Sequence, residues 1–598
     1  MEFIDFKNVH SMLSNTVSTW PDRAAYRTIL DDGSMDSVTW REFDAQVRAV
    51  GKSLMAMGID KGDKANIVSY SNYRWVLTDV ALASIGSCTV GIYHSLLARD
   101  IGYVVKHSDA VLAFAEDPGQ VAKLQEIRDE LPEIRRVVLF KGTPPPGDDW
   151  VISYEDFLEL GQEVTDEDLD ARIAAVEPTD VAAIVYTSGT TGIPKGAVLT
   201  HDNITFTAQS VYGSTKIEEA DHSFLFLPLA HIFARTCVFS ALFAGSTNTF
   251  ARGIDTVAED FRVARPHWFP SVPRIYEKVH TKIISGAQAK GGVALKIFNW
   301  ACSVGDKVSD HLLAKEPIPF TTRAQYALAT KLVFSKVQAA LGGRVRWCIA
   351  GAAPLDPSIG KFFHASGVLI VEGIGMTENT SFTNLNRYDD YRFGWVGPTG
   401  PGIEQMTADD GEVLYRGRNI MREYYKMPAE TAETLTEDGW QHTGDLGEID
   451  NEGFLKITGR KKDLIVTAGG KNVAPSAIEG LIATSPYISQ VCVIGDRRKY
   501  LTALITVDAE NIATYAKENA IPSESLDNLL ASDGINDLIG TVVEQKNKAF
   551  ASFETIKKFR LLEEFSIENG LLTPTLKVKR NVAMERFADV IDGMYTES

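Results

Sequence analysis

A glycine-rich segment that follows a short apolar run places the strongest constraint on this chain. Residues 181–185 are predicted to form a buried β-strand, and residues 186–196 then read Tyr-Thr-Ser-Gly-Thr-Thr-Gly-Ile-Pro-Lys-Gly. Glycines let backbone amides approach and face phosphate oxygens, while hydroxyls add donors and Lys195 adds a mobile positive charge. The spacing differs from G-x-x-x-x-G-K-[ST], because Pro194 precedes the lysine and Gly196 follows it. We interpret the segment as a loop that holds the pyrophosphate end of ATP, and the alternative is a flexible surface turn.

The length and charge of the chain limit its organisation and its partners. A chain of 598 residues exceeds what one hydrophobic core supports, so we expect at least two domains. A hydrophobic content of 44% and a charged content of 23% are typical of a globular protein. The net charge of −19 argues against a nucleic-acid partner, which normally leaves a basic footprint. Anionic small molecules stay compatible with it, because a local basic pocket can exist in an acidic surface.

The cysteines and the apolar stretches predict a cytoplasmic protein. Five scattered cysteines form no C-x-x-C pair and show no metal-ligand spacing, which favours reduced thiols. Acidic residues near the N-terminus argue against a signal peptide. The longest apolar stretch, residues 80–93, is too short to span a bilayer. We therefore expect any membrane contact to be peripheral, at the inner face.

The order of strands and helices predicts the fold class. Helical and strand-like segments alternate over residues 19–116, which indicates parallel βαβ units. Four successive charges at residues 460–463 lie between two strand-like stretches, and the remainder has the size of a small domain. We predict a multi-domain α/β protein with a large N-terminal domain of mixed βαβ sheets, residues 1–459. Residues 460–598 are expected to form a small, mobile α+β domain.

Two polar or small-residue segments follow apolar strands in the middle of the chain. His231 comes directly after the apolar residues 224–230, although a histidine in such surroundings is more often packed than catalytic. The small residues 351–353, Gly-Ala-Ala, follow a predicted strand and would let a flat ring approach the backbone. Each signal is weak when taken alone.

Two carboxylates further along suit a nucleotide. Glu378 stands beside Thr377, and a carboxylate next to a triphosphate requires a cation between them, so it is a candidate Mg²⁺ ligand. The alternative is a plain surface glutamate. Asp445 lies in a turn after an aromatic residue and could accept hydrogen bonds from both hydroxyls of a ribose.

Together and in this order, the segments resemble the adenylate-forming superfamily of acyl-CoA synthetases, luciferases and peptide-synthetase adenylation domains. The resemblance covers roughly residues 22–587 and implies that the N-terminal domain is an adenylation domain. It implies that Lys577, Glu378 and His231 are the catalytic residues, with Mg²⁺ held by Thr187 and Glu378. The implied ATP-binding residues are Thr187, Ser188, Gly189, Thr190, Thr191, Gly192, Lys195, Gly351, Ala352, Ala353, Gly375, Met376, Thr377, Asp445 and Arg460.

Within that superfamily, three stretches look like long-chain fatty acid–CoA ligases. They are Val-Pro-Arg-Ile-Tyr-Glu-Lys at residues 272–278, the long helical insertion that follows, and residues 556–580 around Lys577. This resemblance implies that ATP, a fatty acid and CoA are substrates. Two alternatives stay open, a fatty acyl-AMP ligase that passes the acyl group to a carrier protein and a ligase for other carboxylic acids. A non-catalytic or light-emitting relative is a third, and a homodimer is one option for the assembly.

The resemblance also implies a moving domain. Rotation about Lys462 would withdraw Lys577 and bring Gly469, Gly470 and Lys471 to line the CoA tunnel. The acyl tunnel is assigned to Phe233, Trp268 or Phe269, and His231 becomes a group that positions the acyl carboxylate. Two residues depart from the family pattern: Ile374 replaces an aromatic residue that stacks on adenine, and Val466 replaces a lysine of some relatives.

Overall fold

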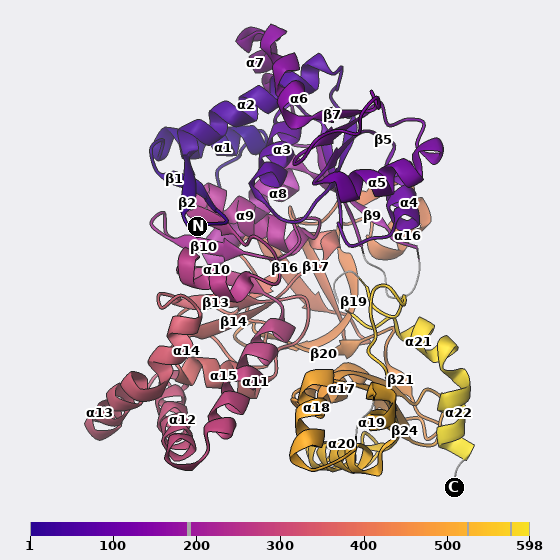
Figure 1. The fold of residues 1–598 in the computed structure, drawn as a ribbon. Helices are drawn as coiled ribbons and strands as arrows, with labels where there is room; N and C mark the ends of the chain where they lie inside the picture. Colours follow the sequence, from indigo (N-terminus) through magenta and orange to yellow (C-terminus); the bar gives the residue numbers. More distant parts are fainter. Residues whose placement is uncertain (1, 188–192, 523–524, 574–576, 597–598) are drawn as a thin grey trace.

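The structure is a computed structural model that describes residues 2–187, 193–522, 525–573 and 577–596 (Figure 1). Two eight-stranded sheets and one four-stranded sheet form the larger part of the molecule, and a smaller body follows residue 460. Helices α3 (Tyr73–Ser84), α8 (His201–Ser214) and α9 (Ile232–Ala244) contact one another or the strands of the two large sheets. The prediction of a multi-domain α/β protein is confirmed.

The first large sheet carries most of the strands that end at the candidate site. Its central strands are parallel, and an antiparallel strand closes each edge. In spatial order they are β15 (Asn384–Leu385), β14 (Leu369–Ile374), β13 (Trp347–Ala350), β12 (Trp268–Ser271), β10 (His222–Leu225), β11 (Thr247–Phe250), β1 (Ala24–Ile29) and β2 (Met35–Thr39). Apolar side chains of both faces are buried, as expected for parallel strands covered on two sides.

The second large sheet carries the glycine-rich segment between two of its strands. In spatial order its strands are β18 (Glu423–Tyr424), β9 (Gly196–Thr200), β8 (Val181–Tyr186), β4 (Cys88–Ile92), β3 (Lys64–Val68), β5 (Ala110–Ala115), β6 (Arg136–Leu139) and β7 (Val151–Ser153). The predicted strand at residues 181–185 is therefore confirmed as part of β8. Around it lie α1 (Val9–Thr19), α2 (Trp40–Ala56), α4 (Ala98–Ser108), α5 (Pro118–Glu126), α6 (Tyr154–Leu160) and α7 (Asp166–Ala174). Thr39 caps α2 in a capping box with Glu42.

A long helical segment leaves the first sheet after β12 and returns to it at β13. It contains α11 (Pro273–Lys290), α12 (Gly292–Leu313), α13 (Phe320–Ala329), a π-helical turn at Thr330–Phe334 and α14 (Ser335–Ala340). Figure 1 shows α12 and α13 projecting away from the sheets, at the lower left. Among the described residues, no helix is both long enough and apolar enough to cross a bilayer.

The four-stranded antiparallel sheet connects the two parts of the molecule. Its strands are β16 (Ile403–Thr407), β17 (Glu412–Gly417), β19 (Gln441–Ile449) and β20 (Leu455–Arg460). The remaining helices of the larger part are α10 (Val257–Ala264), α15 (Pro357–Ala365) and α16 (Pro428–Thr434). The last strand of this sheet ends at the four-charge run that the sequence marks as a boundary.

The smaller body has its own apolar core, built on a three-stranded sheet. Its strands are β23 (Ile488–Ile494), β24 (Leu501–Val507) and β25 (Ile556–Leu562), and a short hairpin precedes them, β21 (Ile465–Val466) and β22 (Asn472–Val473). Its helices are α17 (Pro475–Ala483), α18 (Ala509–Glu518), α19 (Leu526–Ala531), α20 (Asp533–Asn547), α21 (Arg580–Arg586) and α22 (Ala588–Thr596). A separate core is what a mobile domain requires, although the boundary after residue 459 stays a prediction.

A buried ion pair joins two of the helices between the large sheets. The Arg235 guanidinium on α9 donates to both carboxylate oxygens of Asp79 on α3, at 3.1 and 2.6 Å, and its central carbon lies 5.4 Å from the ring centroid of Trp75. Both charged side chains are almost completely excluded from solvent. The pair therefore fixes the first turn of α9, which begins directly after His231.

Replacing Arg235 with methionine should strongly destabilise the larger part of the protein. The change leaves the Asp79 carboxylate buried without its partner, which costs roughly 3–5 kcal/mol. Urea titration of the variant measures this loss. The control is Arg41→Met, which removes an exposed pair with Asp22 and should cost less than about 1 kcal/mol. Equal losses in the two variants would contradict the assignment of the buried pair.

Candidate functional site

The glycine-rich segment is a connection between β8 and β9 that is closed by backbone contacts. The Thr187 N–H donates to the Lys195 carbonyl at 2.9 Å, and the Lys195 N–H donates to the Thr187 hydroxyl at 3.4 Å. Ser188, Gly189, Thr190, Thr191 and Gly192 lie outside the described residues. The Lys195 ammonium lies 5.0 Å from the ring centroid of Tyr424, within the range of a cation–π contact. The residues at the two ends of the predicted phosphate loop, Thr187 and Lys195, are therefore held together by hydrogen bonds.

Glu378 follows β14 in a single 3₁₀ turn, Thr377–Asn379, and is 9% exposed. Its Oε1 accepts a hydrogen bond from the Tyr424 hydroxyl, and its carbonyl accepts one from the Met421 N–H at 2.8 Å. Tyr424 thus contacts both the candidate phosphate-binding lysine and the candidate metal ligand. The sequence reasoning missed Tyr424, because its position depends on the pairing of β18 with β9, two segments far apart in the chain.

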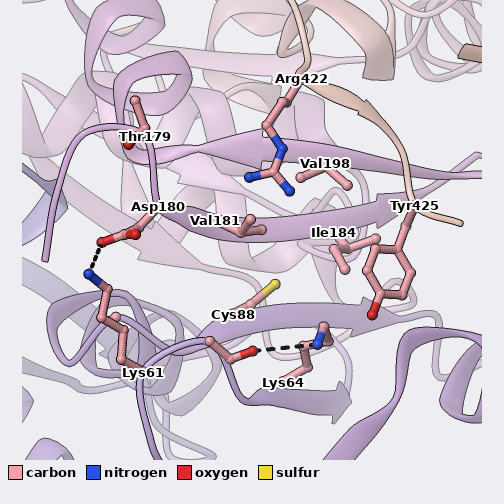
Figure 2. Close-up of a pocket in the computed structure, with 12 residues that line it drawn as sticks. Lys61, Lys64, Cys88, Thr179, Asp180, Val181, Ile184, Val198, Arg422 and Tyr425 are labelled. Atoms are coloured by element: carbon pink, nitrogen blue, oxygen red, sulfur yellow. Dashed lines mark hydrogen bonds and ion pairs between the residues drawn. The ribbon is translucent and has the colours of Figure 1, made fainter.

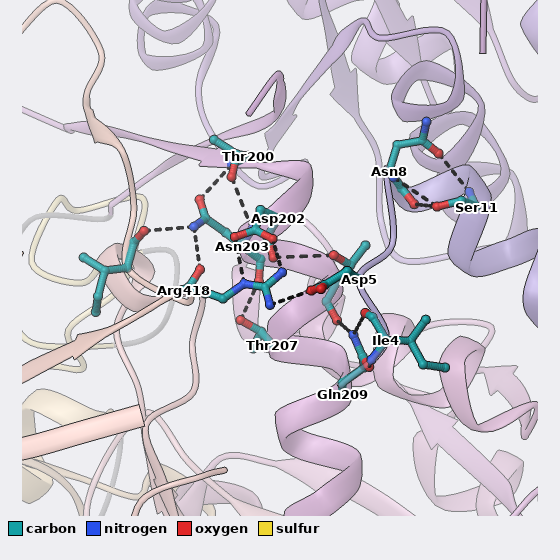
Figure 3. Close-up of polar contacts among 12 residues, drawn as sticks. Ile4, Asp5, Asn8, Ser11, Thr200, Asp202, Asn203, Thr207, Gln209 and Arg418 are labelled. Carbon is teal, nitrogen blue, oxygen red and sulfur yellow. Dashed lines mark hydrogen bonds and ion pairs between the residues drawn. The ribbon is translucent and has the colours of Figure 1, made fainter. Parts of the chain in front are cut away.

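A helix cap holds the loop that supplies Met421. Asn203 closes a capping box with Thr200 at the start of α8. Its side-chain amide also donates to the carbonyls of Arg418 and Ile420, at 2.7 and 2.9 Å (Figure 3). A buried amide that satisfies a cap and two loop carbonyls fixes the geometry of both segments. The backbone position of Glu378 is thereby connected to α8.

Asp445 and Arg460 face each other across β19 and β20. They are directly paired in the sheet register, and Arg460 Nε donates to Asp445 Oδ1 at 2.9 Å. Asp445 is 9% exposed, and this burial raises the pKa of its carboxyl, while Arg460 and then Lys577 oppose the shift. One face of the site therefore contains a buried carboxylate with two cations close to it.

Lys577 is the residue of the smaller body that reaches this face. Its N–H donates to the Thr573 hydroxyl at 3.1 Å, and its carbonyl accepts from the Thr573 N–H at 2.8 Å. The residue keeps surface exposure, but the protein around its ammonium removes much of the water. This desolvation lowers the pKa of Lys577, Arg460 lowers it further, and Asp445 and Asp463 partly offset the effect. The structure thus brings Lys577, Arg460 and Asp445 together.

His231 lies on the same side as Lys577 and caps the N-terminus of α9. Its Nδ1 accepts a hydrogen bond from the Phe233 N–H at 3.1 Å. Burial, with the positive charge of Lys577 as the next cause, lowers the pKa of His231 to about 4. The imidazole is therefore neutral at pH 7, and since Nδ1 is an acceptor, Nε2 carries the proton. His231 can donate a hydrogen bond to an acyl carboxylate and is poorly suited to act as a base.

The small-residue turn at Gly351-Ala-Ala follows β13, with Gly351 buried and Ala353 exposed. Ala352 adopts a left-handed conformation with φ of 70°, and a Cβ at Gly351 would lie 3.3 Å from the ring of Phe233. The Leu355 N–H donates to Glu372 Oε1 at 3.0 Å, which fixes the end of the turn on β14. Burial raises the pKa of Glu372 to about 7, although the Leu355 amide opposes the shift. Glu372 has no role in the sequence reasoning, because only the fold shows that it holds this turn.

The segment before Glu378 also needs its glycine. A Cβ at Gly375 would lie 2.1 Å from the carbonyl carbon of Ser381, so no other residue fits there. The Met376 N–H donates to the Asn379 side chain at 2.6 Å. Ile374 is partly buried against neighbouring apolar residues.

The residues assigned to the acyl tunnel lie in different surroundings. Phe233 is partly buried beside Gly351. Trp268 stacks on Trp347 at 5.3 Å on one face of β12, while Phe269 packs against Phe261 on the other face. Adjacent residues of a strand point to opposite sides, so Trp268 and Phe269 do not line the same channel. At most one of the two can therefore line the tunnel predicted to use Trp268 or Phe269, and its role in acyl binding stays a prediction.

The predicted hinge and CoA hairpin lie at the start of the smaller body. Lys462 is exposed in the turn after β20, and that turn is closed by the Asp463 N–H, which donates to the Arg460 carbonyl at 3.0 Å. Gly469, Gly470 and Lys471 form the exposed tip between β21 and β22, with Gly470 at φ 72°. Lys471 lies over the Phe553 ring of the same body. Lys577 lies near Asp445 in this arrangement, and its assignment to adenylate formation stays a prediction.

The side chains fit a magnesium ion that arrives with a nucleotide. Among the described residues, no group of three or more His, Cys, Asp or Glu side chains could hold a metal. Glu378 supplies one buried carboxylate and Thr187 one hydroxyl. Mg²⁺ is typically bound through one or two carboxylates with substrate phosphates and water completing the octahedron. Glu378 and Thr187 therefore suit Mg²⁺ only together with phosphate oxygens.

A separate cavity of about 430 Å³ lies on the other side of β18 (Figure 2). Tyr425 lines it, whereas the neighbouring Tyr424 bonds to Glu378. Lys61 at its rim is already paired with Asp180 at 2.7 Å. None of the predicted site residues lines this cavity, so it is distinct from the candidate site.

The comparisons with known proteins agree on one family. The profile described as "AMP-binding enzyme" matches residues 13–425, and that described as "AMP-binding enzyme C-terminal domain" matches residues 462–598. The chain is 36% identical over 596 residues to "Long-chain-fatty-acid--CoA ligase FadD15" of Mycobacterium tuberculosis, covering 99% of this chain and 97% of the relative. It is 30% identical over 596 residues to "Long-chain-fatty-acid--CoA ligase ACSBG2" of Homo sapiens, covering 93% and 88%.

Solved structures share the fold at low identity. The adenylation domain of a carboxylic acid reductase from Segniliparus rugosus, in complex with AMP, has a TM-score of 0.77 at 20% identity, over 99% of this chain and 95% of that one. A fatty acyl CoA synthetase from Mycobacterium tuberculosis has a TM-score of 0.61 at 22% identity, over 98% and 99%. These structures establish the architecture of both parts of the chain.

Replacing Tyr424 with phenylalanine should weaken the use of Mg²⁺ and ATP. The variant keeps the ring beneath Lys195 but loses the hydroxyl that bonds to Glu378. Loss of such a supporting hydrogen bond typically costs about 10- to 100-fold in metal affinity or activity. Initial rates measured against Mg²⁺ and ATP concentration test this, with Tyr425→Phe as the control because its hydroxyl bonds to Asp109 on the surface. Equal behaviour of the two variants would refute a supporting role for Tyr424.

Proposed function

The chain belongs to the AMP-binding enzyme family, and from this premise we propose that it is a long-chain fatty acid–CoA ligase. The proposed reaction converts ATP, a fatty acid and CoA into acyl-CoA, AMP and pyrophosphate through an acyl-adenylate. The observation that carries the proposal is the position of Lys577, which the smaller body brings beside Asp445, Arg460 and His231. The long-chain assignment is supported by the names of the full-length relatives and by the helical segment α11–α14.

The first half-reaction requires that two anions meet. A fatty carboxylate is already ionised, so its oxygen attacks the α-phosphorus without a strong base, and the bond from that phosphorus to the bridging oxygen of pyrophosphate breaks. Lys577 would contact the carboxylate and the α-phosphate, and His231 Nε2 would donate to the carboxylate. The barrier is lowered by orientation and by charges placed in advance, rather than by proton transfer.

The remaining residues would hold the nucleotide. Asp445 would accept from the ribose hydroxyls with Arg460 beside it, and the Gly351 turn would contact the adenine. Thr187 and Lys195, with the predicted residues 188–192 between them, would hold the leaving pyrophosphate. Glu378 and Thr187 would hold Mg²⁺, which when bound offsets phosphate charge.

Thioester formation needs a second arrangement of the same two bodies. We propose that the smaller body rotates about Lys462, which removes Lys577 and brings the tip Gly469–Gly470–Lys471 to the acyl-adenylate. The CoA thiol loses its proton to water, its sulfur attacks the acyl carbonyl, and AMP leaves with the electron pair of the broken C–O bond. Such hinge motion lets one site serve two reactions. We also propose that the protein works at the inner face of a membrane, where long-chain fatty acids partition.

The substrate assignment is tested by a panel of acids assayed with ATP, with and without CoA. Palmitate should give acyl-CoA with a kcat/KM at least about a hundredfold above that of butyrate, because each buried methylene contributes about 0.8 kcal/mol. AMP release without CoA should stop after roughly one turnover, since the adenylate stays bound. A preference for butyrate or benzoate would reject the long-chain assignment. Transfer to a carrier protein with no acyl-CoA formation would favour the acyl-AMP ligase.

The two half-reactions should separate in variants of Lys577 and Lys462. Lys577→Ala should lower adenylate formation by about 10²- to 10³-fold and largely spare CoA attack on pre-made acyl-adenylate, because the lysine is withdrawn in that step. Single-turnover assays of each half-reaction measure the effect.

Lys462→Pro provides the reciprocal variant, because proline fixes a backbone dihedral where the hinge must turn. It should slow thioester formation and leave adenylate formation near the normal rate. Equal loss of both half-reactions in Lys577→Ala, or unchanged thioester formation in Lys462→Pro, would be incompatible with the rotation.

A further inference from the structure

The outermost helix of the α11–α14 segment presents an apolar stripe to solvent. Phe320 is 84% exposed at the start of α13, and Leu328 is 50% exposed at its end. Ala324, between them, and Leu332, in the π-helical turn that follows, are exposed as well. These four positions are four residues apart, which places them on one side of the helix. Figure 1 shows α13 at the lower left tip of the molecule.

The opposite side of the same helix is packed, so the stripe is not a sign of a loose element. Ala329 and Phe334 are buried in a small cluster with Ala301 and Val304 of α12, and Tyr326 packs against it. A helix held by one apolar side has no need of a second one for its own stability. A single exposed apolar residue is ordinary, whereas a contiguous exposed apolar patch marks an interaction surface.

The charge around the stripe differs from that of the rest of the protein. Residues 317–355 contain no aspartate and no glutamate, although the whole chain has a net charge of −19. Arg323 and Lys331 flank the apolar stripe, Lys336 follows it, and all three are exposed. A basic, apolar helix face is complementary to an anionic surface. The exposed acidic residues nearest to it are Glu316, which precedes α13, and Asp306 and Asp310 on α12.

The size and shape of this surface favour a lipid bilayer over a protein. A stable protein interface usually buries about 800 Å² on each partner, which exceeds what four side chains of one short helix supply. An interfacial helix needs only shallow burial of its apolar side chains among lipid headgroups, with cations beside them. Each lysine or arginine near an anionic leaflet adds about 1 kcal/mol of attraction. A protruding helix tip can reach a bilayer without steric conflict from the sheets.

We infer that α13 and the turn after it, with Phe320 and Leu328 inserted and Arg323 and Lys331 at the headgroups, dock this protein on an anionic lipid surface. The biological purpose of the contact rests on the proposed function, because such a surface would be the source of the fatty acid. The helix is joined through α12 and α11 to β12, the strand that carries residues assigned to the acyl channel. The docking itself requires no catalysis.

The test is flotation of the full-length protein with vesicles of phosphatidylcholine alone or mixed with phosphatidylglycerol. The wild type should float with the mixed vesicles and much less with phosphatidylcholine alone. The double variant Phe320→Ser/Leu328→Ser should bind at least about tenfold more weakly, because both inserted side chains are lost. Arg323→Gln/Lys331→Gln should lose about fivefold for each cation and should lose its salt dependence. The matched control is Ile254→Ser, which removes a side chain that is 59% exposed outside this segment.

The other outcomes contradict the inference. Wild-type binding that survives in both double variants, or is lost equally in Ile254→Ser, would show that α13 is not the docking surface. Failure of the wild type to bind, together with a dimer that Phe320→Ser/Leu328→Ser dissociates in light scattering, would assign the stripe to a second copy of the chain. All variants should make acyl-CoA from dissolved fatty acid at the wild-type rate. An inactive wild type that still floats would overturn the proposed function and leave the docking intact.

Discussion

Two buried carboxylates, Glu378 and Asp445, are the constraint on which the site depends. Each is only 9% exposed, and a buried carboxylate is stable only with donors or cations close to it. Tyr424 donates to the first and Arg460 to the second, yet a polyphosphate substrate would add further negative charge. Lys577, from the other body, supplies a further cation. The electrostatics of the site therefore favour the arrangement in which the two bodies are docked.

The same constraint explains why the supporting structure is so specific. Glu378 has its carbonyl fixed by Met421, whose loop is held by the side chain of Asn203 on α8. His231 is placed at the first turn of α9, which the buried Arg235–Asp79 pair anchors. Residues that carry charge at the centre are thus positioned by buried hydrogen bonds and a buried ion pair of other elements. A neutral His231 and a desolvated Lys577 follow from this enclosure, and they suit hydrogen bonding and charge contact with a carboxylate.

The sequence predicted the parts of this site that are local in the chain. Short motifs contain the glycine-rich segment, Glu378, Asp445 and Lys577, and these motifs follow one another in the order that the family resemblance implies. The α/β class follows from the alternation of strands and helices. The roles of the individual residues stay predictions. The motif residues 188–192 lie outside the described structure.

What the sequence could not predict depends on contacts between distant segments. Tyr424 is an ordinary tyrosine until β18 pairs with β9, and Glu372 is unremarkable until its carboxylate meets the Leu355 amide. Trp268 and Phe269 are neighbouring apolar residues, and only the strand shows that their side chains point to opposite sides. The sequence also did not predict the exposed apolar stripe on α13, because only the fold shows which side of a helix faces solvent.

The central claim is that the docked arrangement forms an acyl-adenylate before any thiol is involved. Exchange of labelled pyrophosphate into ATP, measured without CoA, tests it most directly, because exchange requires reversible adenylate formation. We expect exchange that depends on both a long-chain fatty acid and Mg²⁺ and that stops on chelation of the metal. Acyl-CoA formation that proceeds with no fatty-acid-dependent exchange under any of these conditions would contradict it.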